Sequence, residues 1–218
     1  MYCSSNQLSK LDLSNNPDLE HVYCASNLLT ELDITRCYKL KSLNCEKNKL
    51  ESLDLSGNPE LINLYSRHNM LTQLDVSHNT KLIFIETFDN QLTSFDCTML
   101  KDLEFLHIDY NKLTTLDMSQ NPNLQGNGFV VANNQLDYLI MPNIPGKNIE
   151  ASVFYEQNPK QGYENIKWYY DSSYSQEVKE TDMIPANGQK LYVKWIANPY
   201  TVYYNANGGQ GNIPSQSV

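Results

Sequence analysis

The sequence predicts a mainly β fold, in which a solenoid of 21-residue turns with short strands and few or no helices precedes a small β-rich segment. An asparagine returns every 21 residues from Asn6 to Asn111, and again at Asn134 after two inserted residues. A leucine follows each of these asparagines two places later. Beyond Pro159 the period ends, and tyrosine-rich segments with alternating polarity begin. Such a period is typical of stacked units, because one turn alone cannot bury its apolar side chains.

Within each turn, three slots hold apolar or small side chains. Residues 61–71 read Leu-Ile-Asn-Leu-Tyr-Ser-Arg-His-Asn-Met-Leu, with a small serine in the third slot. The underlying spacing, L-x-x-L-x-L-x-x-N-x-L, resembles the leucine-rich-repeat family over residues 1 to about 142. An eighth, looser turn is expected at 153–158. A second segment, seen for example as Leu53-Asp-Leu-Ser, recurs in the other half of the turns and predicts a second extended side of a flattened coil.

The recurring asparagines are interpreted as scaffold. A coil that turns sharply leaves backbone N–H and C=O groups without partners, and burying such groups unpaired is costly. A side-chain amide supplies two donors and one acceptor. We therefore expect the asparagine column to satisfy the backbone of the turns and not to bind a ligand.

Aspartates form a second column, each with serine or threonine two residues later. Hydrogen bonds to those residues are expected to offset the repulsion between stacked carboxylates, while a row of bound cations stays open as an alternative. The column consists of Asp12, Asp33, Asp54, Asp75, Asp96 and Asp117.

Residues able to carry chemistry are spread over different turns. Cys3, Cys24 and Cys45 share one inward slot, which does not surround a metal tetrahedrally, and the odd total of five cysteines argues against a disulfide framework. The four histidines lie in different turns, and no serine stands at a strand-to-helix elbow. Glu86 and Asp109 could be paired for glycosidic chemistry, but any acidic repeat face offers such pairs. The sequence thus predicts no enzyme, no metal and no cofactor.

The net charge of -9 resides on the repeats. Residues 1–159 hold 11 Lys and Arg against 20 Asp and Glu, whereas residues 160–218 hold five of each. An acidic surface repels phosphate backbones, so we expect no nucleic-acid partner. No apolar run approaches the roughly 20 residues of a membrane span, so we expect no membrane insertion. Both ends read as interrupted repeats, and the signal and anchor of a longer protein are expected outside this sequence.

One side of the coil varies from turn to turn, whereas the side that carries the aspartates is monotonous. Variable outward positions gather five aromatic residues within three successive turns, which favours an interaction site. Two alternatives are that the rings fill space between strands, or that another domain covers them. The candidate partner-binding residues are Tyr65, Arg67, Phe84, Glu86, Phe88, Phe105, His107, Asp109 and Tyr110.

The C-terminal part has its own pattern. Segments 165–170, 190–195 and 200–204 read as strands, and residues 205–209 as a turn. The first two segments resemble the second half of the β-grasp-like B repeat of internalin-type surface proteins, and residues 199–209 resemble the start of the next copy. The expected domains are therefore a solenoid at 1–159, a β-rich cap or partial B-type repeat at 160–196, and a truncated further repeat at 197–218.

The two resemblances together imply a bacterial protein that is secreted or displayed on the cell surface. They imply a non-enzymatic, adhesin-like module that recognises a protein partner on a host or neighbouring cell through its variable strand face. Glycan binding is an alternative, since aromatic rings also stack on sugars. A structural stalk without a ligand of its own is a further alternative.

Overall fold

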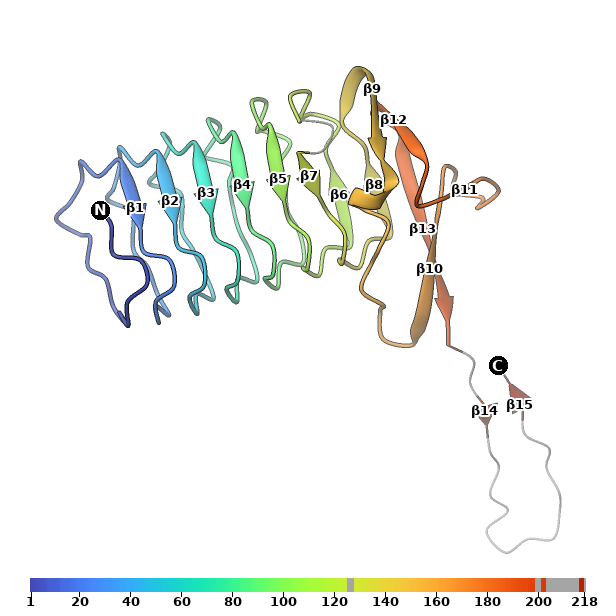
Figure 1. Ribbon diagram of the computed structural model, residues 1–218, viewed down its shortest axis with the longest axis horizontal. Helices are drawn as coiled ribbons and strands as arrows, with labels where there is room; N and C mark the ends of the chain where they lie inside the picture. Colours follow the sequence, from blue (N-terminus) through green and yellow to red (C-terminus); the bar gives the residue numbers. More distant parts are fainter. Residues whose placement is uncertain (125–127, 199–200, 203–215, 218) are drawn as a thin grey trace, which may run out of the picture.

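The computed structural model describes residues 1–124, 128–198, 201–202 and 216–217 (Figure 1). Turns of similar shape stack side by side from β1 to β8, and the C-terminal strands β9 to β13 lie at the far end of the stack (Figure 1). The 3-10 helix η1 (Ala151–Val153) is the only helix within the described ranges. The prediction of a mainly β solenoid with short strands is confirmed.

Six parallel strands form the first sheet, in the order β1-β2-β3-β4-β5-β7. Neighbouring strands up to β5 pair at a constant offset, so that Leu43 lies beside Leu64 and Phe84 beside Phe105. Side chains alternate along a strand, so the middle residue faces the core and its neighbours face outward. Equivalent residues of successive turns therefore form straight columns. The strands are β1 (His21–Tyr23), β2 (Ser42–Asn44), β3 (Asn63–Tyr65), β4 (Phe84–Glu86), β5 (Phe105–His107) and β7 (Phe129–Val130).

A second sheet, in the order β11-β10-β13-β8-β6, joins the last turns to the C-terminal part. In this sheet β6 and β8 come from the second half of two solenoid turns and pair in parallel. Strand β13 then pairs antiparallel with β8, so the C-terminal segment continues the solenoid's own sheet. The strands are β6 (Thr115–Asp117), β8 (Tyr138–Ile140), β10 (Tyr163–Tyr169), β11 (Glu177–Val178) and β13 (Lys190–Ala197).

Two further strand pairs complete the described structure. Strand β9 (Asn143–Glu150) pairs antiparallel with β12 (Met183–Asn187), which links the end of the repeats to the C-terminal part a second time. Strand β14 (Thr201–Val202) pairs with β15 (Gln216–Ser217). The further repeat predicted at 197–218 falls mostly outside the described residues. The domain boundaries stay predictions. The pairings of β9 with β12 and of β8 with β13 join the parts of the chain on either side of residue 159.

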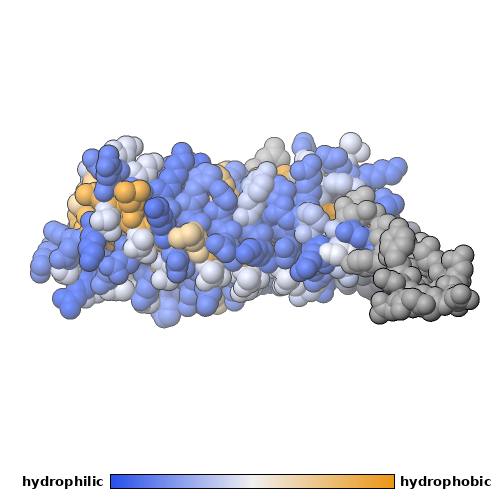
Figure 2. All heavy atoms as spheres, turned by 90° about the horizontal axis from the view of Figure 1, so that it is seen from below, coloured by the Kyte–Doolittle hydropathy of each residue, from blue (hydrophilic) through white to orange (hydrophobic). Residues whose placement is uncertain are grey.

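One apolar core runs through the turns and into the C-terminal strands. At its C-terminal end Trp168 is fully buried, packs edge-on against Phe154 with 5.0 Å between ring centroids, and donates its indole N–H to the carbonyl of Tyr155 at 2.9 Å. At the N-terminal end, Leu8 and Leu19 pack on the core but are only partly buried. Figure 2 shows apolar atoms gathered near that end of an otherwise mainly hydrophilic face.

The inward slot of the cysteines behaves as a site for small buried side chains. Cys24 and Cys45 are fully buried, and the next turns place Ser66 there, whose hydroxyl donates to Thr87 at 3.1 Å. Burial raises the pKa of the Cys24 thiol to about 12. The thiols therefore remain protonated at neutral pH, which disfavours thiolate chemistry.

The asparagine column satisfies the backbone as predicted. In Asn69 the side-chain oxygen accepts the N–H of Leu50 at 3.0 Å, and the nitrogen donates to the carbonyls of Cys45 and Ser66 at 3.0 and 3.1 Å. The same three kinds of bond, two to the preceding turn and one within the turn, are made by Asn27, Asn48, Asn90, Asn111 and Asn134.

The eighth turn departs from the pattern at one position. Gln157, and not Asn158, supplies the amide: its oxygen accepts the N–H of Leu136 at 3.2 Å, and its nitrogen donates to the carbonyl of Phe154 at 2.7 Å. The longer glutamine side chain thus continues the column, which an asparagine spacing alone could not predict.

Every residue just before a column asparagine has a left-handed backbone. The φ angles are 54° at Ser26, 54° at His68, 53° at Asp89 and 51° at Tyr110. Residues other than glycine pay a conformational cost in this region, typically compensated by surrounding structure. Here the amide bonds of the next residue fix the bend, so the position accepts serine, histidine, aspartate or tyrosine alike.

Candidate interaction surface on the first sheet

The predicted site residues lie on and beside β3, β4 and β5. Register places Tyr65 beside Glu86 and Glu86 beside His107, with Phe84 beside Phe105 in the parallel column. All of these side chains are half-buried. The structure therefore brings most of the candidate residues onto one continuous surface.

Four rings form a row that we call the aromatic ridge: Tyr65, Phe84, Phe105 and His107. Phe84 and Phe105 stack at 4.3 Å between centroids with an interplanar angle of 4°. Tyr65 meets Phe84 at 5.1 Å, and His107 meets Phe105 at 4.1 Å, each at 37°. Because the central rings cover one another's faces, the ridge presents mainly ring edges to its surroundings.

The five aromatic residues at the variable outward positions, Tyr65, Phe84, Phe88, Phe105 and Tyr110, differ in their exposure. Tyr110, with 53% of its surface exposed, is the only one of the five whose side chain is largely free, and among the described residues it enters no ring pair. Phe88 forms no ring pair with the ridge among the described residues and instead makes a T-shaped pair with His68, at 5.1 Å between ring centroids. Stacking between neighbouring turns explains the partial burial, as the space-filling alternative anticipated, but the outer edges remain accessible.

Arg67 is held between two carboxylates. Its Nε lies 2.5 Å from Glu46 and 3.5 Å from Glu86, and its guanidinium lies 5.3 Å from the centroid of the Phe88 ring. The Glu46 side chain is only 13% exposed. The sequence analysis did not include Glu46 in the site, although its place one turn before Arg67 in the same column, with opposite charge, is a signal that could have identified it.

Two carboxylates on this surface, Glu86 and Asp109, have pKa values above the ordinary range. Burial raises the pKa of Glu86, an effect that Arg67 opposes and Glu46 reinforces. Burial also raises the pKa of Asp109, and nearby Asp89 and Glu86 add to the rise. Among the described residues, no cationic group of this chain forms an ion pair with Asp109. Burial lowers the pKa of His107, which therefore stays neutral at pH 7.

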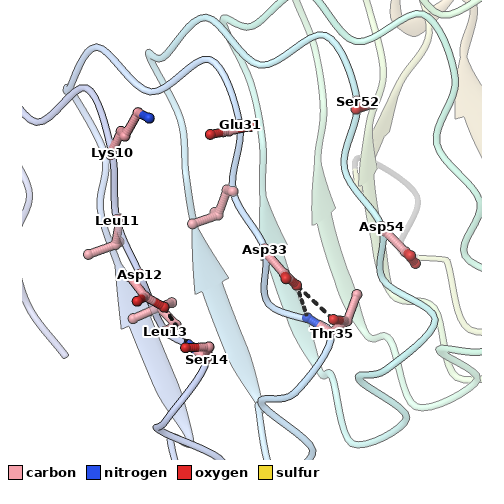
Figure 3. Close-up of a pocket in the computed structure, with 11 residues that line it drawn as sticks. Lys10, Leu11, Asp12, Leu13, Ser14, Glu31, Asp33, Thr35, Ser52 and Asp54 are labelled. Carbon is pink, nitrogen blue, oxygen red and sulfur yellow. Dashed lines mark hydrogen bonds between the residues drawn. The ribbon is translucent and has the colours of Figure 1, made fainter.

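On the other side of the coil, the aspartate face consists of carboxylates that accept hydrogen bonds from their own turns. Figure 3 shows Asp12, Asp33 and Asp54 in successive turns along a groove of about 530 Å³. Asp33 accepts both the backbone N–H and the hydroxyl of Thr35, at 3.0 and 2.7 Å. Each of the six aspartates accepts the N–H of the serine or threonine two residues later, which agrees with the hydrogen-bond interpretation.

These hydrogen bonds lower the pKa of Asp12, Asp33, Asp54, Asp75 and Asp96. Within the part of the chain that the structure describes, no group of three or more His, Cys, Asp or Glu side chains is arranged to hold a metal ion. The carboxylates of this face thus accept hydrogen bonds from their own turns. On the first sheet, Glu46 and Glu86 share the single cation Arg67, and Asp109 has no ion-pair partner among the described residues.

Replacing Asp109 by asparagine should stabilise the protein at pH 7. An Asp pKa raised by folding means that the ionised carboxylate opposes folding at neutral pH, and that this cost disappears as the pH falls through the folded pKa and then the unfolded one. After allowance for partial solvent screening we expect a gain of about 0.5 kcal/mol, or about 1–2 °C in Tm.

Thermal unfolding of both proteins at pH 7 and pH 3 measures this difference. The gain should vanish at pH 3, where Asp109 is protonated in both states. The charge-matched control Asp54→Asn should behave oppositely at pH 7, because hydrogen bonds to Ser56 lower the pKa of that residue. A loss of stability in Asp109→Asn would contradict the prediction, because it would show that other groups of the chain stabilise the ionised Asp109 carboxylate in the folded state.

Comparisons with known proteins place the fold. No family model matches the sequence, and no curated protein matches it. Among solved structures, the functional domain of InlJ from Listeria monocytogenes matches with a TM-score of 0.50 and 19% identity, over 90% of this chain and 71% of that one. A leucine-rich-repeat protein of Leptospira interrogans matches with a TM-score of 0.52 and 28% identity, over 56% of this chain and 33% of that one.

The fold is a leucine-rich-repeat solenoid. An internalin of Listeria monocytogenes, inlF, also matches, with a TM-score of 0.47 and 23% identity over 53% of this chain and 35% of that one. The InlJ domain is described as including a cysteine ladder, and in this leucine-rich-repeat solenoid Cys3, Cys24 and Cys45 occupy one slot in successive turns. In the described ranges, no helix is long and apolar enough to span a membrane.

Proposed function

We propose that this leucine-rich-repeat solenoid is a non-enzymatic binding module that recognises a protein partner through the outward face of β3, β4 and β5. The observation that carries the proposal is the aromatic ridge, a continuous row of half-buried rings on the variable side of the coil. Aromatic residues are enriched at the centres of protein interfaces. A preformed sheet also reduces the ordering cost of association, because its side chains are already fixed by their neighbours.

The orientation of the rings favours a protein over a glycan. A sugar stacks on an open aromatic face, but Phe84 and Phe105 each turn one face to the other, and Tyr65 and His107 crowd them at tilted angles of 37°. Ring edges and the clefts between them suit apolar side chains, which pack edge-on against aromatic groups. The glycan alternative therefore keeps only Phe88 and the exposed Tyr110 as candidate stacking surfaces.

The setting that we propose is the surface or exterior of a bacterial cell. The fold is shared with InlJ and with the Leptospira protein, and the C-terminal sequence resembles the B repeats of internalin-type surface proteins. In this setting the solenoid would display the ridge towards a host or neighbouring cell, and the C-terminal part, with residues 160–196 as cap or partial repeat, would lie towards the anchor.

The test replaces Phe84 by asparagine and Phe105 by serine in one variant. These residues already occupy the same column at Asn63 and Ser42, so the turns should keep their register. Wild type and variant are applied to an array of host and bacterial extracellular proteins and to a glycan array. We expect a protein ligand whose binding falls at least tenfold in the variant, which corresponds to about 1.4 kcal/mol.

A matched control replaces Tyr38, which is 57% exposed outside the strand face, by asparagine and should bind like wild type. Circular dichroism and Tm measurements confirm that each variant folds. Ligand binding that survives the loss of both phenylalanines would contradict the proposed surface. Binding confined to the glycan array would favour the glycan alternative, and the absence of any ligand would favour a stalk.

A further inference from the structure

Glu86 is surrounded by aromatic side chains on the outward face. Register places Tyr65 and His107 directly beside it on the neighbouring strands. Phe84 precedes it by two residues on β4, so both side chains lie on the same face. Phe88 lies just beyond the end of β4, and the Arg67 side chain joins it to this face, because Arg67 lies 5.3 Å from the centre of the Phe88 ring and 3.5 Å from Glu86. A carboxylate set among rings is a suitable environment for a cation, because the carboxylate attracts the charge and ring surfaces add cation–π attraction.

The chain itself provides an example of this recognition. The Arg67 guanidinium lies against Phe88 and is paired with Glu46, with Glu86 at 3.5 Å as a second acceptor. In the same outward column Asp109 follows Phe88 by one turn, on the side opposite Arg67. Phe88 therefore lies between a preceding turn that supplies Arg67 and the ring of His68, and a following turn that supplies the carboxylate of Asp109.

The charges of this face do not balance. In the two outward columns that contain Glu86 and Phe88, Glu46, Glu86 and Asp109 supply three carboxylates, and Arg67 supplies one cation. His68 pairs with Asp89 at 2.6 Å, so it is not available to the other carboxylates. On the aspartate face, by contrast, each carboxylate already accepts hydrogen bonds from its own turn. The uncompensated negative charge of the first sheet favours a cation from outside the chain.

We infer that the surface around Glu86 and Asp109 receives a lysine or arginine side chain of the protein partner, while an adjacent apolar side chain of that partner packs on the aromatic ridge. This inference rests on the proposed function and specifies the chemistry of its partner. The cation would lie against Phe88 opposite Arg67, paired with Asp109 and within the field of Glu86. In the partner segment, cationic and apolar side chains would thus alternate along the sequence.

A defined peptide tests the inference without the natural partner. The probe is a blocked pentapeptide in which leucine alternates with arginine, and its counterpart carries uncharged citrulline in place of arginine. Binding to the full chain is followed by amide and methyl NMR shifts. We expect the arginine peptide to shift signals of β3 to β5 and to bind about tenfold more tightly than the citrulline peptide.

Two variants that remove the same charge locate the effect. Glu86→Gln with Asp109→Asn should weaken binding of the arginine peptide about tenfold and leave the citrulline peptide unchanged. The control, Asp33→Asn with Asp54→Asn on the opposite face, should leave both unchanged. If both double variants bind the arginine peptide equally weakly, the effect comes from net charge alone and the inference is overturned. The inference is also overturned if the wild-type protein binds the arginine and citrulline peptides equally tightly.

The natural partner from the protein array separates this inference from the proposed function. If loss of Phe84 and Phe105 abolishes partner binding while loss of the Glu86 and Asp109 charges does not, the inference fails and the proposed function stands. If both variants bind the partner like wild type, the proposed function fails as well. A tenfold loss in each variant supports both.

Discussion

Replacing Asn69 by alanine should lower the free energy of unfolding by about 3 kcal/mol. The change removes the acceptor of the Leu50 N–H and the donor to the carbonyls of Cys45 and Ser66. All three bonds are buried, and those to Leu50 and Cys45 join Asn69 to the preceding turn, so water cannot replace the missing amide without opening the stack. Urea unfolding followed by circular dichroism measures the loss.

Asn6 supplies the matched control for this substitution. It occupies the same position in the first turn, but its amide is exposed and, among the described residues, bonds only to the carbonyls of Cys3 and Ser4 in its own turn. Asn6→Ala should therefore cost less than about 0.5 kcal/mol. Equal losses at the two positions would mean that local turn preference, and not bonding between turns, explains the asparagine column.

Replacing Trp168 by alanine should destabilise the protein by about 3–5 kcal/mol. The side chain is fully buried, packs on Phe154 of the last turn, and donates to the carbonyl of Tyr155. Because β13 also pairs with β8, we expect the solenoid and the C-terminal strands to unfold in one transition that shifts to lower temperature. Calorimetry together with hydrogen exchange at β5 and at β10 measures whether the two regions lose protection together.

The conservative variant Trp168→Phe isolates the indole hydrogen bond. It keeps most of the buried ring and loses the N–H donor to Tyr155, so the expected cost is about 1 kcal/mol. If Trp168→Ala melts β10 while β5 keeps its original stability, the C-terminal strands form a separate unit, as the predicted boundary near residue 160 would require. A single shared transition would instead assign them to the end of the solenoid.

The periodic part of the fold was predictable because its interactions recur at one spacing. The asparagine column gives the register, and alternation along each strand then assigns Leu64 to the core and Tyr65 to the outside. The candidate surface follows from the same register, because the 21-residue spacing by itself places Phe84 beside Phe105. Placing these two residues side by side required only the repeat length, and not the conformation of any single turn.

Three features of the structure could not be predicted from the repeat spacing: the ring stacking, the role of Gln157 and the pairing of β13 with β8. The face-to-face stacking of Phe84 and Phe105 follows from side-chain rotamers, and it reduces the exposure that the sequence led us to expect. Gln157 takes the place of an asparagine after η1, at 23 residues from Asn134, where the 21-residue spacing no longer applies. Pairing of β13 with β8 joins segments about 50 residues apart in sequence, and no repeat unit specifies such a contact.

The amide bonds between turns have a consequence for how this chain can change in length. From Asn27 to Asn111, each column asparagine reaches its partners in the preceding turn 19 and 24 residues earlier, so insertion or removal of one whole 21-residue unit among these turns recreates the same bonds at the junction. A duplicated segment such as 49–69 would therefore add a turn without a new loop or a new core. Genetic duplication could in this way move the aromatic ridge further from the C-terminal strands, or repeat one of its rows, while every existing turn kept its neighbours.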